Sequence, residues 1–326
     1  MIPTWITDRR GNVYLNDLTK YVKSVLLVPP ANQNPLTIAA APAATVPTFS
    51  PPILFQGGED SVSEVYSLTG AFDPASVAAA NARATVQITE TTYRRQYMNR
   101  AILLNHVFGN NLQPFFLNES ILLESQANLQ FQFFNNSTAG EVIWRMVLEA
   151  RKYQASAFAN QQVTKTLELL RKRKTFVNPY WLTSNEAIVL PPSGAPRTAF
   201  FDNTRDYFLI LKYVMAQVIT TGVAGDTQEL FTFRLFDAKT DRPLMNQPVT
   251  LNTGCGTARF PFVLPHSLLV EPRTSIRAEL RSLVTDANVE VFFTFHGVGA
   301  YVAEENPYDQ MSIEQPAQTM PVHGAP

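Results

Sequence analysis

The chain offers few side chains that could perform chemistry, and its histidines show this most directly. There are four of them, at His106, His266, His296 and His323. None is spaced from another histidine, aspartate or glutamate in a way that would set metal ligands on a shared face. An internal repeat described below aligns His266 with Glu119 and His296 with Glu149, so its copies share no histidine. We therefore predict that each histidine faces solvent or lies in a turn.

Other reactive arrangements are also missing from the sequence. Gly222–Thr227 has neither the lysine nor the length of a phosphate-binding loop, so a hairpin turn is predicted there. No Gly-x-Ser-x-Gly nucleophile elbow occurs. The carboxylate pairs Glu59-Asp60 and Glu304-Glu305 lie at segment borders and are interpreted as solvated. The single cysteine, Cys255, excludes an intrachain disulfide and a cysteine-built zinc site. These features predict a protein without catalytic residues, metal or cofactor.

One basic cluster stands out, at Arg171, Lys172, Arg173 and Lys174. It ends a segment rich in Ala, Gln, Leu, Glu and Lys, without Gly or Pro, which predicts a helix over residues 155–174. Cations at a helix C-terminus are favoured by the helix dipole, so a solvated helix end is one interpretation. Contact with phosphate or an acidic partner is the other. Four charges in a nearly neutral chain favour the first.

The composition is that of a folded protein with a surface short of charge. The 326 residues suffice for two domains with sizeable cores, and 45% of them are hydrophobic. Only 16% are charged, and the net charge of −1 provides no field toward nucleic acid or an anionic membrane. Together with 22 Phe and 11 Tyr, this predicts a surface covered by other chains. No segment resembles a signal peptide or approaches the roughly 20 apolar residues of a membrane span, which predicts synthesis in a cytoplasm.

The strongest pattern in the sequence is an internal repeat. Residues 88–152 and 235–299 align without a gap at a constant offset of 147. The identical positions are Arg95, Met98, Asn99, Leu104, Asn105, Gly109, Pro114, Phe115, Leu117, Ser120, Leu122, Glu124 and Val142 with Arg242, Met245, Asn246, Leu251, Asn252, Gly256, Pro261, Phe262, Leu264, Ser267, Leu269, Glu271 and Val289. Asn99 and Asn246 are predicted to bond their own backbone in turns. Because the copies share turn and core residues and differ at every histidine, the duplication favours a scaffold over a duplicated catalytic site.

Each copy is predicted to be a β-sandwich. In Val289–Phe295, Val289, Val291, Phe293 and Phe295 occupy alternate positions, which is the period of a half-buried strand. Short strands separated by turn signals are typical of an antiparallel sandwich or jelly roll. The predicted fold is all-β, with two tandem jelly-roll-like antiparallel sandwiches at residues 59–154 and 198–303. A helix and an irregular connector are expected over residues 155–197, and an extended or mobile tail over residues 304–326.

Residues 1–58 are predicted to form an N-terminal arm, of which residues 29–52 hold seven prolines and no charge. Proline fixes φ and cannot donate to a sheet ladder, so extended, partly polyproline-like chain is expected. A disordered linker is the alternative, but free linkers are usually charged or rich in Gly and Ser. We predict that this apolar arm lies ordered against a neighbouring surface. The predicted assembly residues are Pro29, Pro30, Leu36, Ile38, Val46, Phe49, Ile53 and Leu54.

Four motifs of the second copy carry a family resemblance. They are Arg242-Pro-Leu-Met-Asn-Gln-Pro-Val, Phe260-Pro-Phe-Val-Leu-Pro, Leu269-Val-Glu-Pro and His296-Gly297. In these motifs the chain resembles virion structural proteins of tailed bacteriophages. The first copy matches more loosely, because Gln96 stands for Pro243 and Asn118 stands for Pro265. The resemblance implies a part in a virus particle and no enzymatic activity.

These observations together predict a non-enzymatic virion structural protein. A capsid decoration or cement protein is expected first, and a collar or tail accessory protein second. The expected partners are copies of itself, in a homo-oligomer, and other capsid, portal or tail proteins, without specific nucleic-acid binding or a membrane. The alternative is a carbohydrate- or receptor-binding module of a phage tail, for which Tyr180-Trp181 would be the exposed aromatic platform. A glycan-cleaving enzyme would instead need two carboxylates converging in a cleft.

Overall fold

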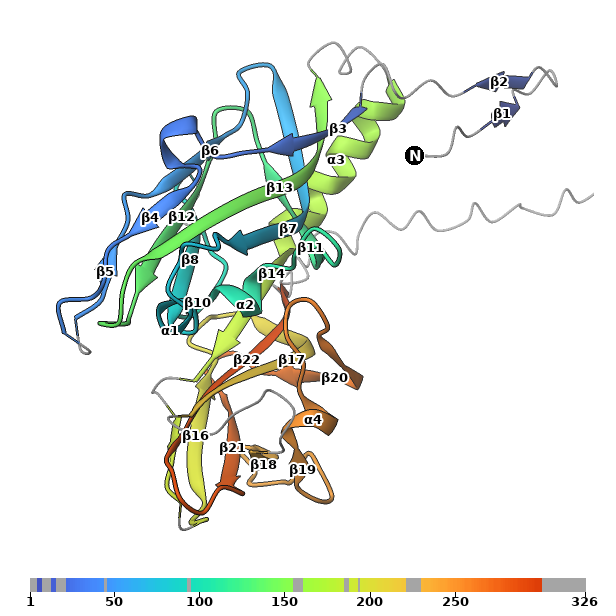
Figure 1. Ribbon diagram of the computed structural model, residues 1–326. Helices are drawn as coiled ribbons and strands as arrows, with labels where there is room; N and C mark the ends of the chain where they lie inside the picture. The colour runs from blue at the N-terminus through green and yellow to red at the C-terminus, as the bar shows by residue number, and fades with distance from the viewer. Residues whose placement is uncertain are drawn as a thin grey trace, which may run out of the picture.

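Two β-sandwiches, one above the other in Figure 1, make up most of the protein. The computed structural model describes residues 5–7, 13–15 and 22–300, except 44–45, 93–94, 155–160, 185–187, 193 and 221–229. Near the N-terminus, β1 (Trp5–Thr7) and β2 (Val13–Leu15) form an antiparallel pair of their own. The predicted turn at 222–227, the pair Glu304-Glu305, His323 and the tail 304–326 lie outside the described residues.

The first sandwich contains the strands from β3 to β13. They are β3 (Val22–Leu27), β4 (Leu36–Ile38), β5 (Thr48–Phe49), β6 (Ile53–Gln56), β7 (Ser61–Phe72), β8 (Ala84–Glu90), β9 (Arg95–Gln96), β10 (Ile102–Leu103), β11 (Phe115–Leu123), β12 (Asn128–Asn135) and β13 (Val142–Gln154). Three short helical turns join them: η2 (Ala31–Gln33), α1 (Ala78–Asn81) and α2 (Leu104–Val107). One sheet has the order β10-β8-β12, continued by β5 and β6, and the other has the order β11-β7-β13, continued by β3 and β4.

The second sandwich repeats this plan with the strands from β14 to β22. They are β14 (Val177–Thr183), β15 (Ile188–Leu190), β16 (Arg197–Asp202), β17 (Phe208–Thr220), β18 (Phe231–Asp237), β19 (Val249–Thr250), β20 (Phe262–Val270), β21 (Ser275–Ser282) and β22 (Val289–Ala300), with the helical turn α4 (Leu251–Gly254). One sheet has the order β16-β21-β18-β19. The other has the order β20-β17-β22, continued by β14 and β15.

The strand order of both sandwiches is that of a jelly roll. When β4, β6, β7, β8, β10, β11, β12 and β13 are numbered from one to eight, the two sheets of the first sandwich read 1-8-3-6 and 2-7-4-5. The strands from β15 to β22, numbered in the same way, give the same two orders. Two antiparallel sheets connected in this way are built from two Greek keys. The predicted all-β fold with two jelly-roll-like sandwiches is confirmed.

The duplication extends beyond the segments that align in sequence. β8, β10, β11 and β12 each begin 147 residues before β18, β19, β20 and β21. β7 corresponds to β17 at an offset of 146, because Val65 pairs with Ala150 as Leu211 pairs with Gly297. Upstream, β3 and β4 pair with β13 as β14 and β15 pair with β22. The first copy therefore starts at β3, and the second copy starts at β14.

The predicted arm is part of the first sandwich, which corrects the boundary expected at residue 58. β3 and β4 hydrogen-bond to β13, and β5 and β6 hydrogen-bond to β12, all within the same chain. The surface on which the arm lies is thus its own domain. All seven prolines of residues 29–52 fall between these strands, where no ladder hydrogen bond has to be donated.

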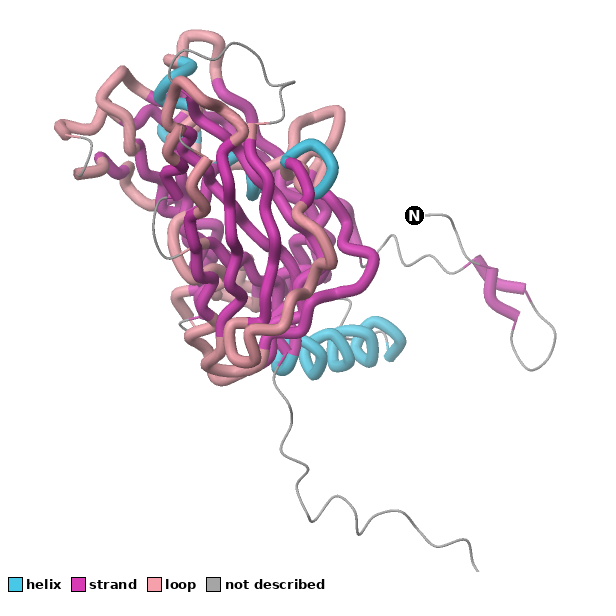
Figure 2. Tube along the Cα trace, turned by 90° about the horizontal axis from the view of Figure 1, so that it is seen from below, coloured by secondary structure: helices cyan, strands magenta, loops and turns pink. Residues whose placement is uncertain are grey.

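The predicted connector also contains regular structure. Helix α3 (Gln161–Phe176) ends two residues later than expected and leads directly into β14, while residues 155–160 lie outside the described part. β14 and β15 then pair with β22, so this segment belongs to the second sandwich. Pro179 is tolerated inside β14 because β14 is the terminal strand of its sheet. Figure 2 shows α3 on the outside of the body that the strands form.

Each sandwich has a core built from the inward faces of its strands. β12 shows the expected alternation, with Leu129, Phe131 and Phe133 buried in the first core. Phe233 and Phe293 occupy the second core. Three residues of the second sandwich, Trp181 of β14, Met215 of β17 and Ala258, lie in the first core instead.

Candidate functional site

The structure divides the predicted assembly residues of the arm into two groups. Leu36, Ile38, Ile53 and Pro29 are buried, and the three aliphatic side chains belong to the first core. The exposed group is Pro30, Val46, Phe49 and Leu54. Alternate residues of a strand point to opposite faces, so no single face could have presented the whole set.

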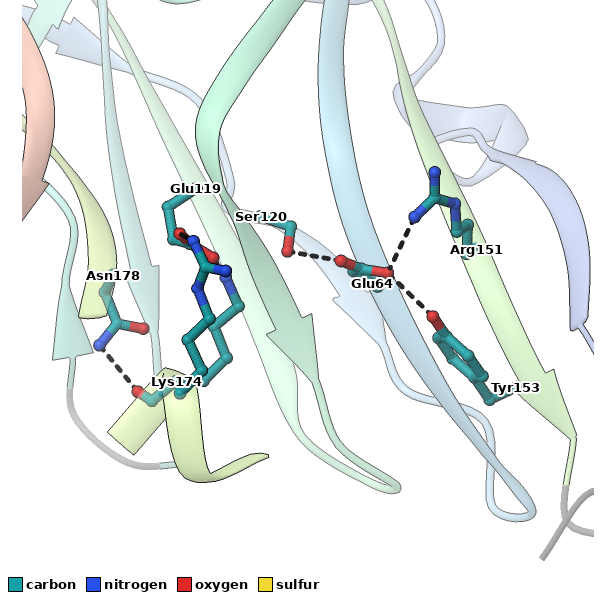
Figure 3. Close-up of polar contacts among 8 residues, drawn as sticks. Glu64, Glu119, Ser120, Arg151, Tyr153, Lys174 and Asn178 are labelled. Carbon is teal, nitrogen blue, oxygen red and sulfur yellow. Dashed lines mark hydrogen bonds and ion pairs between the residues drawn. The ribbon is translucent and has the colours of Figure 1, made fainter. Parts of the chain in front are cut away.

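The basic cluster contacts acidic residues of its own chain. The guanidinium of Arg171 binds both carboxylate oxygens of Glu124 at 2.8 Å. Arg173 and Lys174 both contact Glu119, with 2.5 Å from Arg173 Nη2 to the carboxylate. Figure 3 shows Lys174 beside Glu119. These pairs join α3 to β11 and to the turn after it.

Burial distinguishes the members of the cluster. Lys174 is only 2% exposed, whereas Lys172 is exposed on the helix. Burial lowers the pKa of the Lys174 ammonium, and the hydrogen bond to Glu119 opposes that shift. Through its ion pair with Glu119, Lys174 holds helix α3 on the sheet. Binding of the basic cluster to an outside partner stays a prediction.

A second polar cluster lies on the same face of the sheet. Glu64 of β7 accepts hydrogen bonds from Ser120 Oγ at 2.8 Å and from the Tyr153 hydroxyl at 3.0 Å, and Arg151 lies 3.6 Å away (Figure 3). Burial and the Glu64 carboxylate raise the pKa of Tyr153 above its usual range. The carboxylates of Glu64 and Glu119 are therefore both engaged by donors of the same chain, and the cluster around Glu64 ties β7, β11 and β13 together.

The two sandwiches meet where β14 crosses the first one. The amide N–H of Trp181 donates to the carbonyl of Tyr97 at 2.9 Å, and the N–H of Asn99 donates to the carbonyl of Trp181 at 3.3 Å. The side chain of Asn99 donates to the Thr183 carbonyl at 2.8 Å and accepts from the Thr183 N–H at 3.0 Å. Residues 97–99 therefore act as a short strand that binds β14.

This arrangement corrects two expectations. Asn99 does not bond its own backbone in a turn, because its amide is used 84 residues further along the chain. Tyr180 and Trp181 do not form an exposed aromatic platform, because both side chains are buried. Tyr180 faces the second core and Trp181 faces the first, since neighbouring residues of a strand point in opposite directions.

Aromatic rings surround Trp181 at the junction. Its ring centroid lies 6.2 Å from that of Phe115 in β11 and 4.3 Å from that of His296 in β22. Phe115 also contacts Tyr213 and His296 edge-on, at 6.4 and 5.1 Å. The side chain of Trp181 is thus enclosed by both sandwiches.

Two histidines lie at this junction, whereas each histidine was predicted to face solvent or to lie in a turn. His106 lies in the helical turn α2 but does not face solvent, and His296 lies in strand β22. Of the three histidines within the described residues, His106 and His296 are completely buried, and His266 is exposed as expected. His106 Nδ1 lies 2.9 Å from the Thr294 hydroxyl across the junction, and His296 Nδ1 lies 3.1 Å from the Tyr180 carbonyl. Burial lowers the pKa of both imidazoles to about 3, so both are neutral at pH 7. Among the described residues, no His, Cys, Asp or Glu cluster could hold a metal ion.

Further polar contacts surround this junction. Arg83 of the first sandwich binds Glu290 of the second through two hydrogen bonds, of 2.9 and 2.5 Å. Asn105 Nδ2 donates to Gln217 Oε1 at 3.1 Å, and its carbonyl accepts from the N–H of Ala258 at 2.9 Å. The junction thus combines an aromatic centre with a polar rim, as protein interfaces do.

The corresponding part of the second sandwich is open. A cavity of about 330 Å³ lies beside β20. Its lining includes Leu244, Met245, Phe262, Leu264 and Leu268. On β20 or just before it, the apolar side chains of Phe260, Val263 and Leu269 are exposed. Figure 1 shows β20 and α4 on the flank of this sandwich. An exposed apolar surface on a terminal strand favours pairing with another chain.

A repeated sequence motif marks this site. The motif Arg-x-x-Met-Asn occurs in both copies, at Arg95–Asn99 and Arg242–Asn246. In the first copy it contains the residues that bind β14. Its recurrence therefore marks a strand-binding element, which the predicted role in a turn did not capture.

Comparison with known proteins leaves the chain without an assigned family. No model of a known family matches it, and no curated protein sequence matches it. Among the described residues, no helix is long and apolar enough to cross a membrane.

Several solved structures align with the chain at low similarity. A triple jelly-roll protein of turret assembly in an archaeal virus has 10% identity and a TM-score of 0.23, covering 86% of this chain and 61% of its own. A structure of the Gt strain of infectious bursal disease virus has 10% identity and a TM-score of 0.24, over 87% and 71%. The tandem CBM51 modules of a family 98 glycoside hydrolase from Streptococcus pneumoniae have 13% identity and a TM-score of 0.20, over 89% and 87%. This chain thus spans about three fifths of the archaeal virus protein.

Proposed function

We propose that this chain is a non-enzymatic structural protein of a bacteriophage virion, made in the host cytoplasm and acting through contacts between subunits. The observation that carries the proposal is the apolar cavity beside β20, lined by Phe262, Leu264 and Leu268. Exposed apolar side chains on or next to the same strand, Phe260, Val263 and Leu269, add to this surface. Such a surface is costly on a free monomer and is typical of an interaction site. The virion motifs of the second copy supply the setting.

Within a particle, a capsid decoration or cement protein is the first assignment, and a collar or tail accessory protein is the second. The fold supports either role, because two packed sandwiches give a scaffold with strands at its edges that can pair. The alternative of a carbohydrate-binding module loses its candidate platform, since Tyr180 and Trp181 are buried.

The decisive experiment locates and counts the chain in an intact particle, by cryo-electron microscopy and quantitative mass spectrometry. Copies in the hundreds over the shell support a cement protein, and a ring of about a dozen supports a collar or tail protein. Absence of the chain from purified particles contradicts the proposed function.

A further inference from the structure

We propose that the cavity beside β20 is a docking site for strand β3 of a second copy of this chain, so that copies join head to tail. The inference rests on the assembly role proposed above and specifies the surfaces that would carry it. Its basis is the duplication, because the first sandwich shows the same site occupied.

The occupied site has a clear division of roles. Residues 97–99 of the first sandwich bind the backbone of β14 through Trp181 and Thr183. The indole of Trp181 itself enters the first core, where it packs against Phe115. A strand with a large apolar side chain is therefore the type of ligand that this site takes.

The second sandwich keeps the same framework. Leu244 donates its N–H to the Leu235 carbonyl at 2.8 Å, as Tyr97 does to Ile88 at 3.3 Å. The N–H of Gly256 donates to the Val214 carbonyl at 3.1 Å, matching the 3.1 Å bond from Gly109 to Leu68. Leu244, Met245 and Asn246 thus lie where Tyr97, Met98 and Asn99 lie in the first copy, and the backbone that receives a strand is already formed.

Exposure shows what is missing in the second copy. Met98 and Phe115 are buried in the first sandwich, whereas their counterparts Met245 and Phe262 are partly exposed. Leu244 is 40% exposed, although its counterpart Tyr97 is buried. The difference follows from the occupant, because β14 covers the first site and leaves the second uncovered.

The duplication also identifies the occupant. β3 is the first copy's counterpart of β14, and Leu26 pairs with Glu149 as Trp181 pairs with His296, 147 residues later. Leu26 is 66% exposed on the terminal strand of its sheet. In the proposed contact, Leu26 of a second copy takes the place of Trp181 and enters the cavity. Val28 of the same copy takes the place of Thr183.

The proposed contact can be written bond by bond. The N–H of Leu26 donates to the carbonyl of Leu244, and the N–H of Asn246 donates to the carbonyl of Leu26. The side-chain amide of Asn246 then exchanges two hydrogen bonds with the backbone of Val28. Glu149, at the position of His296, would face Phe262 and is the unfavourable element, because burial of a carboxylate without a partner is costly.

Such a contact joins two different surfaces, one from each end of the chain. It is heterologous, so repeated contacts close a ring or extend a filament. Every copy then has one donor strand, β3, and one acceptor site, beside β20. This property makes the inference testable in solution with the full chain.

The test uses mass photometry and sedimentation velocity on four variants. Leu26→Glu disrupts the donor strand β3, and Leu244→Asp disrupts the acceptor site beside β20. Leu26→Trp gives β3 the side chain that Trp181 provides at the occupied site. Leu283→Glu is the matched control, because Leu283 is 46% exposed and lies outside both surfaces. Circular dichroism and thermal melting establish that each variant is folded.

The wild-type chain and Leu283→Glu are expected to associate with rising concentration. Leu26→Glu and Leu244→Asp should each associate at least roughly tenfold more weakly, and Leu26→Trp more strongly. A mixture of Leu26→Glu with Leu244→Asp should form 1:1 dimers and nothing larger, since one donor and one acceptor remain between them.

The inference is overturned if wild type and Leu26→Trp both stay monomeric, or if the mixture gives no dimer. Capture of a strand from a different virion protein by the β20 site would also overturn it, because the occupant would not be a second copy. Particles that contain the chain and assemble normally with Leu26→Glu contradict this contact and leave the proposed function standing. Particles without the chain contradict the proposed function itself.

Discussion

The side-chain amide of Asn99 and the backbone of Thr183 exchange two hydrogen bonds, of 2.8 and 3.0 Å, across the boundary between the two sandwiches. Asn246, the counterpart of Asn99 in the second copy, is exposed. The same residue in the same repeat therefore has a partner in one copy and faces solvent in the other. This asymmetry allows each contact of the junction to be tested against a control in the same molecule.

Replacing Asn99 should destabilise the folded chain. Asn99→Ala leaves the N–H and carbonyl of Thr183 without their side-chain partners, which we expect to cost about 1–3 kcal/mol of unfolding free energy. Urea titration followed by circular dichroism measures the loss. Asn246→Ala is the control and should leave the monomer unchanged. Equal effects of the two variants would contradict a role of Asn99 at the junction.

Removing the indole of Trp181 should have a larger effect. Trp181→Ala opens a cavity between Phe115 and His296, and we expect a loss of about 3–5 kcal/mol in the free energy of unfolding. The counterpart variant Leu26→Ala, studied at a concentration where the chain is monomeric, should change stability by less than about 0.5 kcal/mol. A Trp181→Ala chain that is as stable as the wild type would show that the junction does not depend on this side chain.

The buried histidines make stability depend on pH in a defined window. Their pKa is about 3 in the folded chain and 6.5 without burial, so between these values the unfolded chain binds protons that the folded chain does not. Their contribution is complete above pH 6.5 and is lost as the pH falls toward 3, with a slope of up to about 1.4 kcal/mol per pH unit for each histidine.

Urea titrations at pH 7.5 and pH 5 measure this slope. The double variant His106→Gln, His296→Gln should show a smaller fall in stability between the two pH values than the wild type. His266→Gln removes an exposed histidine and should keep the wild-type slope. An unchanged slope in the double variant would place the pH dependence elsewhere in the chain.

Within the basic cluster, we expect Lys174 to contribute to stability and Lys172 not to. Lys174→Gln breaks a buried pair with Glu119 and should cost about 3 kcal/mol, at the low end of such losses because Arg173 still contacts the carboxylate. Lys172→Gln, two residues earlier and exposed, should be neutral. If Lys172→Gln instead weakens incorporation into particles while leaving stability intact, the predicted contact with an acidic partner is supported at that residue.

Two neighbouring residues of β6, directly after the proline-rich segment, test the place of the N-terminal arm in the first sandwich. Ile53 is completely buried, and Leu54 is exposed on the opposite face of β6. Ile53→Ala should cost about 2–5 kcal/mol of unfolding free energy. Leu54→Ala should change stability by less than about 0.5 kcal/mol. Comparable effects of both variants on stability would contradict the pairing of β6 with β12.

The sequence predicted the central strands of each sandwich, but it did not predict where each sandwich begins. Alternating residues such as Val289–Phe295 identify a strand because the backbone alternates its side chains whatever the strand pairs with. The alternation in residues 21–28 indicates a strand, but the strands within residues 29–56 and 177–190 were not predicted, because their pairing partners, β12, β13 and β22, lie far away in the sequence. Prolines suggested an arm, whereas they occupy the loops between these short strands.

The site shows the same limit more strongly. The repeated Arg-x-x-Met-Asn motif, the four histidines and the basic cluster are all visible in the sequence. Their surroundings are not, because Asn99 binds Thr183, His106 approaches Thr294 and Lys174 contacts Glu119 over separations of 84, 188 and 55 residues. Two of the four histidines, His106 and His296, are buried at the junction, and burial keeps both imidazoles neutral.

The amino-acid sequence alone determined that this protein is an all-β duplication with few reactive side chains, since periodicity and repetition are local or linear properties of the chain. The tertiary structure alone decided that the two copies are not equivalent. Stacking two units of the same fold in one direction covers the strand-binding site of the first and leaves that of the second exposed. That difference arises from the position of Trp181 and its strand in space.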